Sequence, residues 1–348
     1  MQQPPLGDAA CRHLYWLGAG ASAPVGAPLS RELLERVRRV LDTRRTTASS
    51  EGSSKASPYG KALEALDMAP QGLGIEEVFS TLADPFWSKY VLRAAVGDVS
   101  EALRALRFAV AIAIRDSIAA KGSALSLERF YRDVVHPGDV IVTTNYDDVS
   151  EFGLGPKWGS YWENQGVGPG WGRPVKLSES KVLVVHLHGS YLTTVCERGH
   201  EEFPERYDDW SDPERTRNAA WAELDKLASL NWGCSEPVEF DEWQGKCSEA
   251  LSVTVVPPVS NKGAFSRSVD FEWGLAYSLP TDFNGLTIAG WSANPVDVEA
   301  RALLRHLIRA NRLTRVEVVT RDGGASPALE TLLDGVSLDC RGGGIEAL

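Results

Sequence analysis

Apolar runs of strand length alternate with apolar positions at helical spacing along this 348-residue chain. Runs of apolar, partly β-branched residues end at Leu17, Val142, Leu187 and Ala289, and polar or glycine residues follow closely. Continuous apolar runs of this length are typical of strands buried on both faces of a parallel sheet. Apolar positions at helical spacing lie between and after these runs, as over Asp297 to Ala310. The pattern predicts an α/β fold, a doubly wound and mostly parallel Rossmann-like sheet, with helical insertions that cap the cleft.

The segment after the first strand is expected to be irregular before a helix begins. Two prolines and a glycine, which resist a regular helix, fall within Ala23 to Leu29, so this stretch is predicted to be a loop. Ser30 is a suitable N-cap for a helix whose apolar spacing continues to Leu41. The Ser/Thr/Gly-rich stretch Asp42 to Ser54 has no strand pattern and is predicted to be a polar loop.

Two insertions interrupt the predicted sheet. Residues 57–135 are expected to be mostly helical, and their apolar stretch Ala102 to Ile114 is too short to span a bilayer and predicts a core helix. Residues 191–252 contain a predicted helix with Asp212 as its N-cap. Val316 to Thr320 is predicted to be the last strand of the sheet. The second insertion also carries regularly spaced tryptophans, interpreted as core or substrate-lid aromatics: Trp210, Trp221, Trp232 and Trp243.

Four short segments stand at the ends of the predicted strands: LGAGAS (Leu17 to Ser22), TTNYD (Thr143 to Asp147), LHGS (Leu187 to Ser190) and IAGWS (Ile288 to Ser292). The carboxyl ends of parallel strands meet at one edge of an open α/β sheet, where such sheets place their ligands. Glycines in the first segment permit a tight turn and the close approach of a diphosphate to backbone N–H groups. We therefore expect the four segments to form one site.

The order and content of these segments resemble the sirtuin superfamily, and more closely its bacterial branch of sirtuin-like NAD hydrolases than the protein deacylases. The resemblance implies NAD as the substrate and a sirtuin-like NAD-binding catalytic domain over residues 10–325, followed by a C-terminal helix and tail over 326–348. The implied catalytic residues are His188, Asn145 and Asp147. The implied cofactor-binding residues are Gly18, Ala19, Gly20, Ser22, Thr144, Gly290 and Ser292.

By that resemblance the reaction is hydrolysis of NAD to nicotinamide and ADP-ribose. The bond between nicotinamide and ribose breaks through an oxocarbenium-like state, so the site must fix the carboxamide, expose the sugar and exclude bulk water. Asp147 would orient the carboxamide, and Asn145 would place the ribose hydroxyls or a water. His188 would take a proton from a ribose hydroxyl or from the attacking water. His186 is interpreted as a structural residue deeper in the strand.

The sequence GAGASA also satisfies the dinucleotide-binding fingerprint of dehydrogenases. That fingerprint requires a second strand and an acidic residue about 20 residues further on. The prolines after the turn and the polar stretch that begins at Asp42 provide no such strand, so Asp42 is interpreted as a loop acid. An ordinary dehydrogenase is therefore disfavoured.

Two other functions stay open. An NAD-dependent protein deacylase is disfavoured by the lack of CxxC pairs and by GAPLSRE, which lacks the Phe-Arg pair common in deacylases. A nucleotide-binding sensor without turnover would use the same cleft.

The resemblance to the bacterial branch implies antiphage defence through NAD depletion. No sensor domain is evident after Thr320, so a separate sensor or activator protein, or a homo-oligomer, would have to gate the enzyme.

Composition and charge narrow the expected partners. A net charge of -11 argues against a general surface for nucleic acid or anionic membrane, and no secretory signal is evident, so we predict a cytoplasmic protein. The five cysteines are scattered and odd in number, which does not favour a disulfide framework. Cys196, His200, Cys234 and Cys247 share one region, but their irregular spacing is unlike that of structural zinc sites, so no metal is expected.

Overall fold

The centre of the protein is a six-stranded sheet in which every neighbouring pair of strands is parallel. The computed structural model describes residues 12–50, 57–69, 73–84, 90, 99–121, 125–159, 177–196, 202–203, 210–229, 238–239, 246–247, 251–256 and 269–348. The strands of the sheet are β1 (Arg12–Leu17), β2 (Val140–Thr143), β3 (Leu183–His186), β9 (Phe283–Ala289), β10 (Arg315–Val319) and β11 (Ser337–Arg341). Their order across the sheet is β11-β10-β9-β1-β2-β3.

The direction in which strands are added reverses at β1. The chain first adds β2 and β3 on one side of β1, and later adds β9, β10 and β11 on the other side. This is the strand order of the classic Rossmann sheet, in which a crevice forms at the carboxyl ends of the strands beside the reversal point. The predicted doubly wound parallel sheet is confirmed.

Both faces of the sheet are covered. Tyr15 and Leu17 of β1 belong to one hydrophobic cluster, together with the helices of the first insertion. Leu14 and Trp16 belong to a second cluster on the opposite face, with α12 (Asp270–Tyr277) and α13 (Val298–Ala310). Burial on both faces explains why the sequence shows continuous apolar runs instead of alternating ones.

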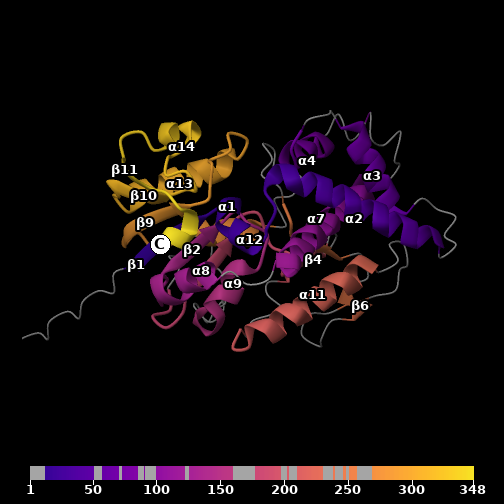
Figure 1. The fold of residues 1–348 in the computed structure, drawn as a ribbon, viewed down its shortest axis with the longest axis horizontal. Coiled ribbons are helices and arrows are strands. Elements are labelled where there is room, and N and C mark those ends of the chain that lie inside the picture. The colour runs from indigo at the N-terminus through magenta and orange to yellow at the C-terminus, as the bar shows by residue number, and fades with distance from the viewer. Residues whose placement is uncertain are drawn as a thin grey trace, which may run out of the picture.

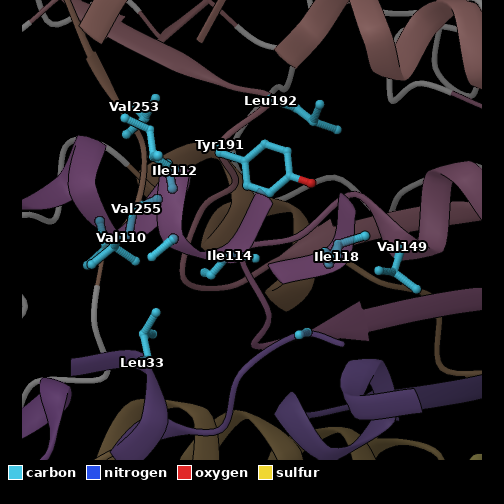
Figure 2. Close-up of a cluster of buried hydrophobic side chains, with 14 of the residues drawn as sticks. Leu33, Val110, Ile112, Ile114, Ile118, Val149, Tyr191, Leu192, Val253 and Val255 are labelled. Atoms are coloured by element: carbon cyan, nitrogen blue, oxygen red, sulfur yellow. The ribbon is translucent and has the colours of Figure 1, made fainter. Parts of the chain in front are cut away.

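Helix α7 (Val99–Lys121) lies at the centre of the larger hydrophobic cluster. Every residue from Ala105 to Ile114 is buried, and all of them except Arg107 are apolar, as expected for a helix inside the core. Figure 2 shows Leu33 on one side of this helix and Tyr191 and Val253 on the other. The predicted core helix is confirmed and extends to both sides of the predicted stretch.

The described part of the first insertion is helical, as predicted. Besides α7 it contains α3 (Pro58–Met68), α4 (Ile75–Ala83), α8 (Leu125–Arg129) and a π-helical turn, η3 (Phe130–Val134). Helices α3 and α7 pack against each other and against α2 (Ser30–Ser50). Figure 1 shows α2, α3, α4 and α7 together at one end of the molecule, away from β10, β11 and α13.

The prediction of a polar loop that begins at Asp42 is wrong, because α2 continues to Ser50. Asp42 is therefore a helical residue: its carboxylate accepts a bond from Arg45 Nη2 at 2.6 Å, one turn further along. Arg44 on the same stretch forms a 3.0 Å ion pair with Asp225 of helix α11 (Pro213–Ser229). A polar composition is compatible with a solvent-exposed helix once tertiary contacts of this kind support it.

The turn before α2 is more regular than predicted. A four-residue helix, α1 (Ala19–Ser22), and a 3-10 turn, η1 (Ala23–Val25), follow β1 directly. Gly26, at a φ of 96°, then ends the regular structure. The predicted loop is confirmed only from Gly26 to Leu29.

The described part of the second insertion contains both a helix and short strands. Helix α11 begins after Asp212, whose carboxylate accepts a 3.1 Å bond from Arg215 N, as predicted. A small antiparallel sheet contains β4 (Thr194–Cys196), β5 (Glu202–Phe203) and β8 (Leu251–Val253), and β6 (Val238–Glu239) pairs with β7 (Lys246–Cys247). Trp210 is buried against Trp158, consistent with a core role. Trp232 and Trp243 lie outside the described residues.

The prediction that Val316 to Thr320 is the last strand is wrong. After α14 (Pro327–Leu332), which Ser326 caps, β11 adds to the edge of the same sheet beside β10. Its sequence, SLDCR, contains polar residues because an edge strand is partly exposed to solvent. The remaining elements are α9 (Val149–Leu154) and the short turns η4 (Gly155–Lys157) and η7 (Gly344–Ala347). None of the helices in the described part of the chain is long and apolar enough for a membrane span.

Candidate functional site

A cavity of about 660 Å³ lies at the carboxyl edge of the sheet, and all four predicted segments contribute residues to it. Seven of the ten predicted site residues line it: Ala19, Thr144, Asn145, Asp147, His188, Gly290 and Ser292. Gly18, Gly20 and Ser22 do not line the cavity. The segments therefore come together, whereas the part that each residue plays in a reaction stays a prediction.

Gly18 and Gly20 pack against the turn that follows β9. Gly18 N donates to Ala289 O and Gly20 N donates to Gly290 O, both at 2.9 Å. A Cβ on Gly18 would lie 2.7 Å from Gly290 O, and a Cβ on Gly290, whose φ is 64°, would lie 2.1 Å from Ala21 N. Contact between two protein segments therefore requires these glycines, and the two amides already have protein acceptors.

Asn145 follows β2, and its side chain is fixed by two bonds. Nδ2 donates to Gly18 O at 3.1 Å and to Ser22 Oγ at 3.0 Å. Because a carbonyl oxygen only accepts, the bond to Gly18 determines the orientation of the amide. Asn145 Oδ1 is buried without a partner among the described residues, in a side chain that lines the cavity. Such an acceptor is suited to a hydroxyl group or a water in the cavity.

Asp147 is a buried acid that shares a network with Asn145. Ser22 Oγ donates to Asp147 Oδ1 at 3.1 Å, and Val149 N donates to the same oxygen at 3.1 Å. Burial, and then the negative charge of Asp148, raise the pKa of Asp147 to about 6. Ser22 thus joins the amide of Asn145 to a carboxyl group that titrates close to neutral pH.

Asp148 is bound by a residue of the second insertion. Arg217 of α11 donates from Nε and Nη2 to the two carboxylate oxygens of Asp148, at 2.9 and 2.8 Å. The guanidinium of Arg217 also lies over the ring of Phe152, 3.5 Å from its centre. A bidentate pair of this geometry is both strong and directional. It attaches the second insertion to the segment that carries Asn145 and Asp147.

His188 stands in the turn after β3 and pairs with a carboxylate. Its Nε2 lies 3.1 Å from Asp297 Oδ2, and both side chains are 2% exposed. Val256 N donates to His188 O at 2.8 Å and so holds the turn from the other side. A carboxylate at one imidazole nitrogen fixes the orientation of the ring. The pair has the arrangement of a general base with its orienting acid.

Asp297 was not predicted as a site residue from the sequence. Asp297 immediately precedes α13 and lines the cavity, whereas the sequence pattern marked it only as the start of a helix. The available signal was its place just after the fourth segment, at the end of SANPVD. Neighbouring residues that also line the cavity, and that were not predicted, are Tyr146, Trp291 and Asn294.

The first insertion covers part of the cavity, as predicted. Its lining residues come from α4, from α7 or from the segment before α4: Gly74, Ile75, Glu77 and Ile114. Leu33 of α2, which precedes the insertion, also lines the cavity. None of the described residues within 191–252 lines the cavity, so the predicted capping by the second insertion is not seen in that part of the chain.

The carboxyl groups that line the cavity have no lysine or arginine counterpart among the described lining residues. Glu77, Asp147 and Asp297 supply these carboxyl groups. Within the described ranges no group of three or more His, Cys, Asp or Glu residues is placed to hold a metal ion. Of the residues weighed as zinc ligands, His200 and Cys234 lie outside these ranges.

The fold and the cavity define an α/β protein with a site at the reversal point of a parallel sheet. No protein-family model and no curated protein sequence matches the chain. Among solved structures, it is similar to a sirtuin studied for its substrate affinity, with 13% identity over 94% of this chain and 87% of the other, and a TM-score of 0.40. A Sir2 complex with a p53 peptide and NAD+ is 12% identical over 94% and 86% of the two chains, with a TM-score of 0.39.

A Sir2 complex with the inhibitor EX-527, 2'-O-acetyl-ADP-ribose and a deacetylated p53 peptide is similar over 97% of this chain and 90% of the other, at 13% identity and a TM-score of 0.36. Structural similarity at this level leaves the function to be argued from the cavity and its residues.

Proposed function

We propose that the protein hydrolyses NAD to nicotinamide and ADP-ribose in the cavity at the carboxyl edge of the sheet. The observation that carries the proposal is the presence in one cavity of the His188–Asp297 pair and the unpartnered Asn145 Oδ1. The motif order that resembles sirtuin-like NAD hydrolases supports NAD as the substrate. The reversal of strand order at β1 supports a dinucleotide ligand, because such sheets bind dinucleotides at that point.

The proposed reaction transfers the ribose from nicotinamide to water. The C–N bond to nicotinamide breaks, the electron pair leaves with nicotinamide, and a water oxygen forms the new bond to the ribose carbon. His188 accepts one proton of that water and Asp297 stabilises the resulting imidazolium. Asn145 Oδ1 accepts a hydrogen bond from the water or from a ribose hydroxyl. This bond holds the water or the ribose in line with the bond that breaks.

Asp147 and the other acidic lining residues would stabilise the positively charged nicotinamide ring. NAD carries its positive charge on the nicotinamide, and cavity carboxylates favour that charge. The ionised form of Asp147 can also accept a bond from the carboxamide nitrogen. Leu33, Ile75 and Ile114 supply an apolar side that limits the access of bulk water.

The biological role that we propose is NAD depletion in bacterial antiphage defence, in a gated form. The motif resemblance to the bacterial branch supports this role. The gate would be a separate activator protein or self-assembly, and the Arg217–Asp148 pair offers a route from the second insertion to the site.

The first experiment is to incubate the purified protein with NAD, with and without an acetyl-lysine peptide, and to separate nicotinamide and ADP-ribose by chromatography. We expect peptide-independent ADP-ribose, lost in His188→Gln and kept in His306→Gln, which alters an exposed histidine on α13. Nicotinamide that appears only with peptide, together with O-acetyl-ADP-ribose, would replace the hydrolase with a deacylase. NAD binding by calorimetry without turnover at any protein concentration would favour a sensor.

A further inference from the structure

His186 has an acceptor at each ring nitrogen. Nδ1 lies 3.0 Å from Asn145 O, and Nε2 lies 2.6 Å from Glu151 Oε1. The carbonyl oxygen can only accept, so Nδ1 carries a proton, and the carboxylate of Glu151 favours a second proton on Nε2. His186 is 7% exposed. The ring is therefore a buried imidazolium that donates in two directions.

The groups around His186 come from several elements. Glu151 belongs to α9, and Glu272 of α12 accepts a 3.3 Å bond from His186 N. Asp147 lies in the segment after β2, and Arg217 pairs with the neighbouring Asp148. Burial alone would lower the pKa of His186, but the charge and hydrogen bond of Glu151 raise it to about 10. Burial raises the pKa of Glu272 to about 7.

Asn145 is held at two points by different parts of the molecule. His186 binds its main-chain oxygen, and Gly18 O and Ser22 Oγ bind its side-chain nitrogen. Together these bonds determine where the unpartnered Oδ1 lies in the cavity wall. The positive charge of His186 also opposes the rise in the pKa of Asp147 that burial causes.

We propose that His186 is a positioning residue for the reaction: its bond to the main-chain oxygen of Asn145 sets where the Asn145 side chain lies in the cavity wall. It acts through Asn145, and its charge acts on Asp147, since it does not line the cavity. This inference rests on the proposed NAD hydrolysis. It assigns a role in the reaction to a histidine whose sequence context indicated only a structural one.

Two substitutions separate the two donor bonds. In His186→Asn the amide nitrogen can occupy the place of Nδ1, which keeps the donor to Asn145 O. In His186→Gln the nitrogen reaches the place of Nε2, which keeps the donor to Glu151 and loses the one to Asn145 O. We expect His186→Gln to lower kcat about 100-fold, the cost of a displaced catalytic group, and His186→Asn to lower it less. His306→Asn is the matched control.

The pH profile provides a second test. Both substitutions remove the positive charge near Asp147, so the acid limb of kcat/KM should move to higher pH in each variant and stay in place in His306→Asn. A purely structural role would lower the amount of folded enzyme without moving this limb. Equal kcat in the Asn and Gln variants, with an unmoved acid limb, would overturn the inference.

A measurement without substrate separates this inference from the proposed function. The Tm values of wild type, His186→Asn, Asp147→Asn and the double variant form a cycle. We expect His186→Asn to lower Tm less when Asp147 is already Asn, because the favourable charge interaction is then gone. The cycle needs no NAD turnover, so its result stands whether or not the proposed function does; additive Tm changes would refute the coupling between His186 and Asp147.

Discussion

The two histidines of the VHLHGS segment (Val185 to Ser190) have different surroundings, although one residue separates them. His188 lines the cavity and meets one carboxylate, Asp297, whereas His186 lies behind the cavity wall between Glu151 and the carbonyl of Asn145. The first arrangement places a histidine and its carboxylate beside the space for a substrate. In the second arrangement both ring nitrogens of His186 are bound to acceptors of the protein itself. Residue type and spacing alone therefore do not distinguish the two histidines, whereas the partners of each ring do.

The strongest test of the comparison is His188→Gln. The amide nitrogen can keep a bond to Asp297, while the base is lost. We expect NAD hydrolysis to fall about 10³-fold, within the range for removal of a general base, with little change in Tm. Nicotinamide release and a thermal melt measure the two effects. Activity near that of wild type would remove His188 from the reaction.

Asp297→Asn should have the next largest effect. The isosteric amide keeps a contact with His188 Nε2 but cannot stabilise an imidazolium. We expect kcat to fall about 100-fold, as for a misoriented catalytic group. The measurement is single-turnover nicotinamide release, and Asp322→Asn, far along the chain after β10, serves as the control. Unchanged kcat would show that Asp297 only precedes a helix.

Asp147→Asn should lower activity but raise stability. The pKa of Asp147 is raised from 3.8 to about 6, so the folded protein binds this proton more tightly than the unfolded chain does. The cost of ionisation is therefore fully present above about pH 6 and disappears as the pH falls below about 4. We expect Asp147→Asn to raise the free energy of unfolding by roughly 2 to 3 kcal/mol at pH 7. Urea melts at pH 4 and pH 7 measure it; an equal gain at both would contradict the assignment.

Ser22→Ala should have the smallest effect on activity and the opposite sign in stability. Its hydroxyl joins Asn145 Nδ2 to Asp147 Oδ1, so the substitution leaves two buried polar groups short of a partner. We expect the free energy of unfolding to fall by about 1 to 2 kcal/mol and turnover to fall by less than about tenfold. Ser22→Thr, which keeps a hydroxyl, tests whether the bond or the added volume matters.

The sequence predicts the sheet and the place of the site because buried parallel strands leave a clear pattern. Continuous apolar runs mark β1, β2, β3 and β9, and the polar segments at their ends meet as expected. Strand β11 was missed because an edge strand is partly exposed and its sequence is polar. The length of α2 was missed because Arg44 meets Asp225 only in the folded protein.

The site was predicted in its segments but not in its pairings. The contact of Asp297 with His188 joins the residue before α13 to the turn after β3, and no local pattern encodes that contact. The glycines were attributed to room for a diphosphate, whereas the close approach of Gly290 and Trp291 already excludes a Cβ at Gly18. Long-range contacts of this kind are the part of the site that a single sequence does not contain.

The contact between the first and last segments has a consequence for the history of this chain. Gly18 and Gly20 touch Gly290 with no room for a side chain on any of them. A substitution in one segment therefore changes what the other will tolerate, although most of the chain separates them. Among homologous sequences we expect these glycines to be inherited as a set, and a lineage that replaces one of them should carry compensating changes in the facing turn.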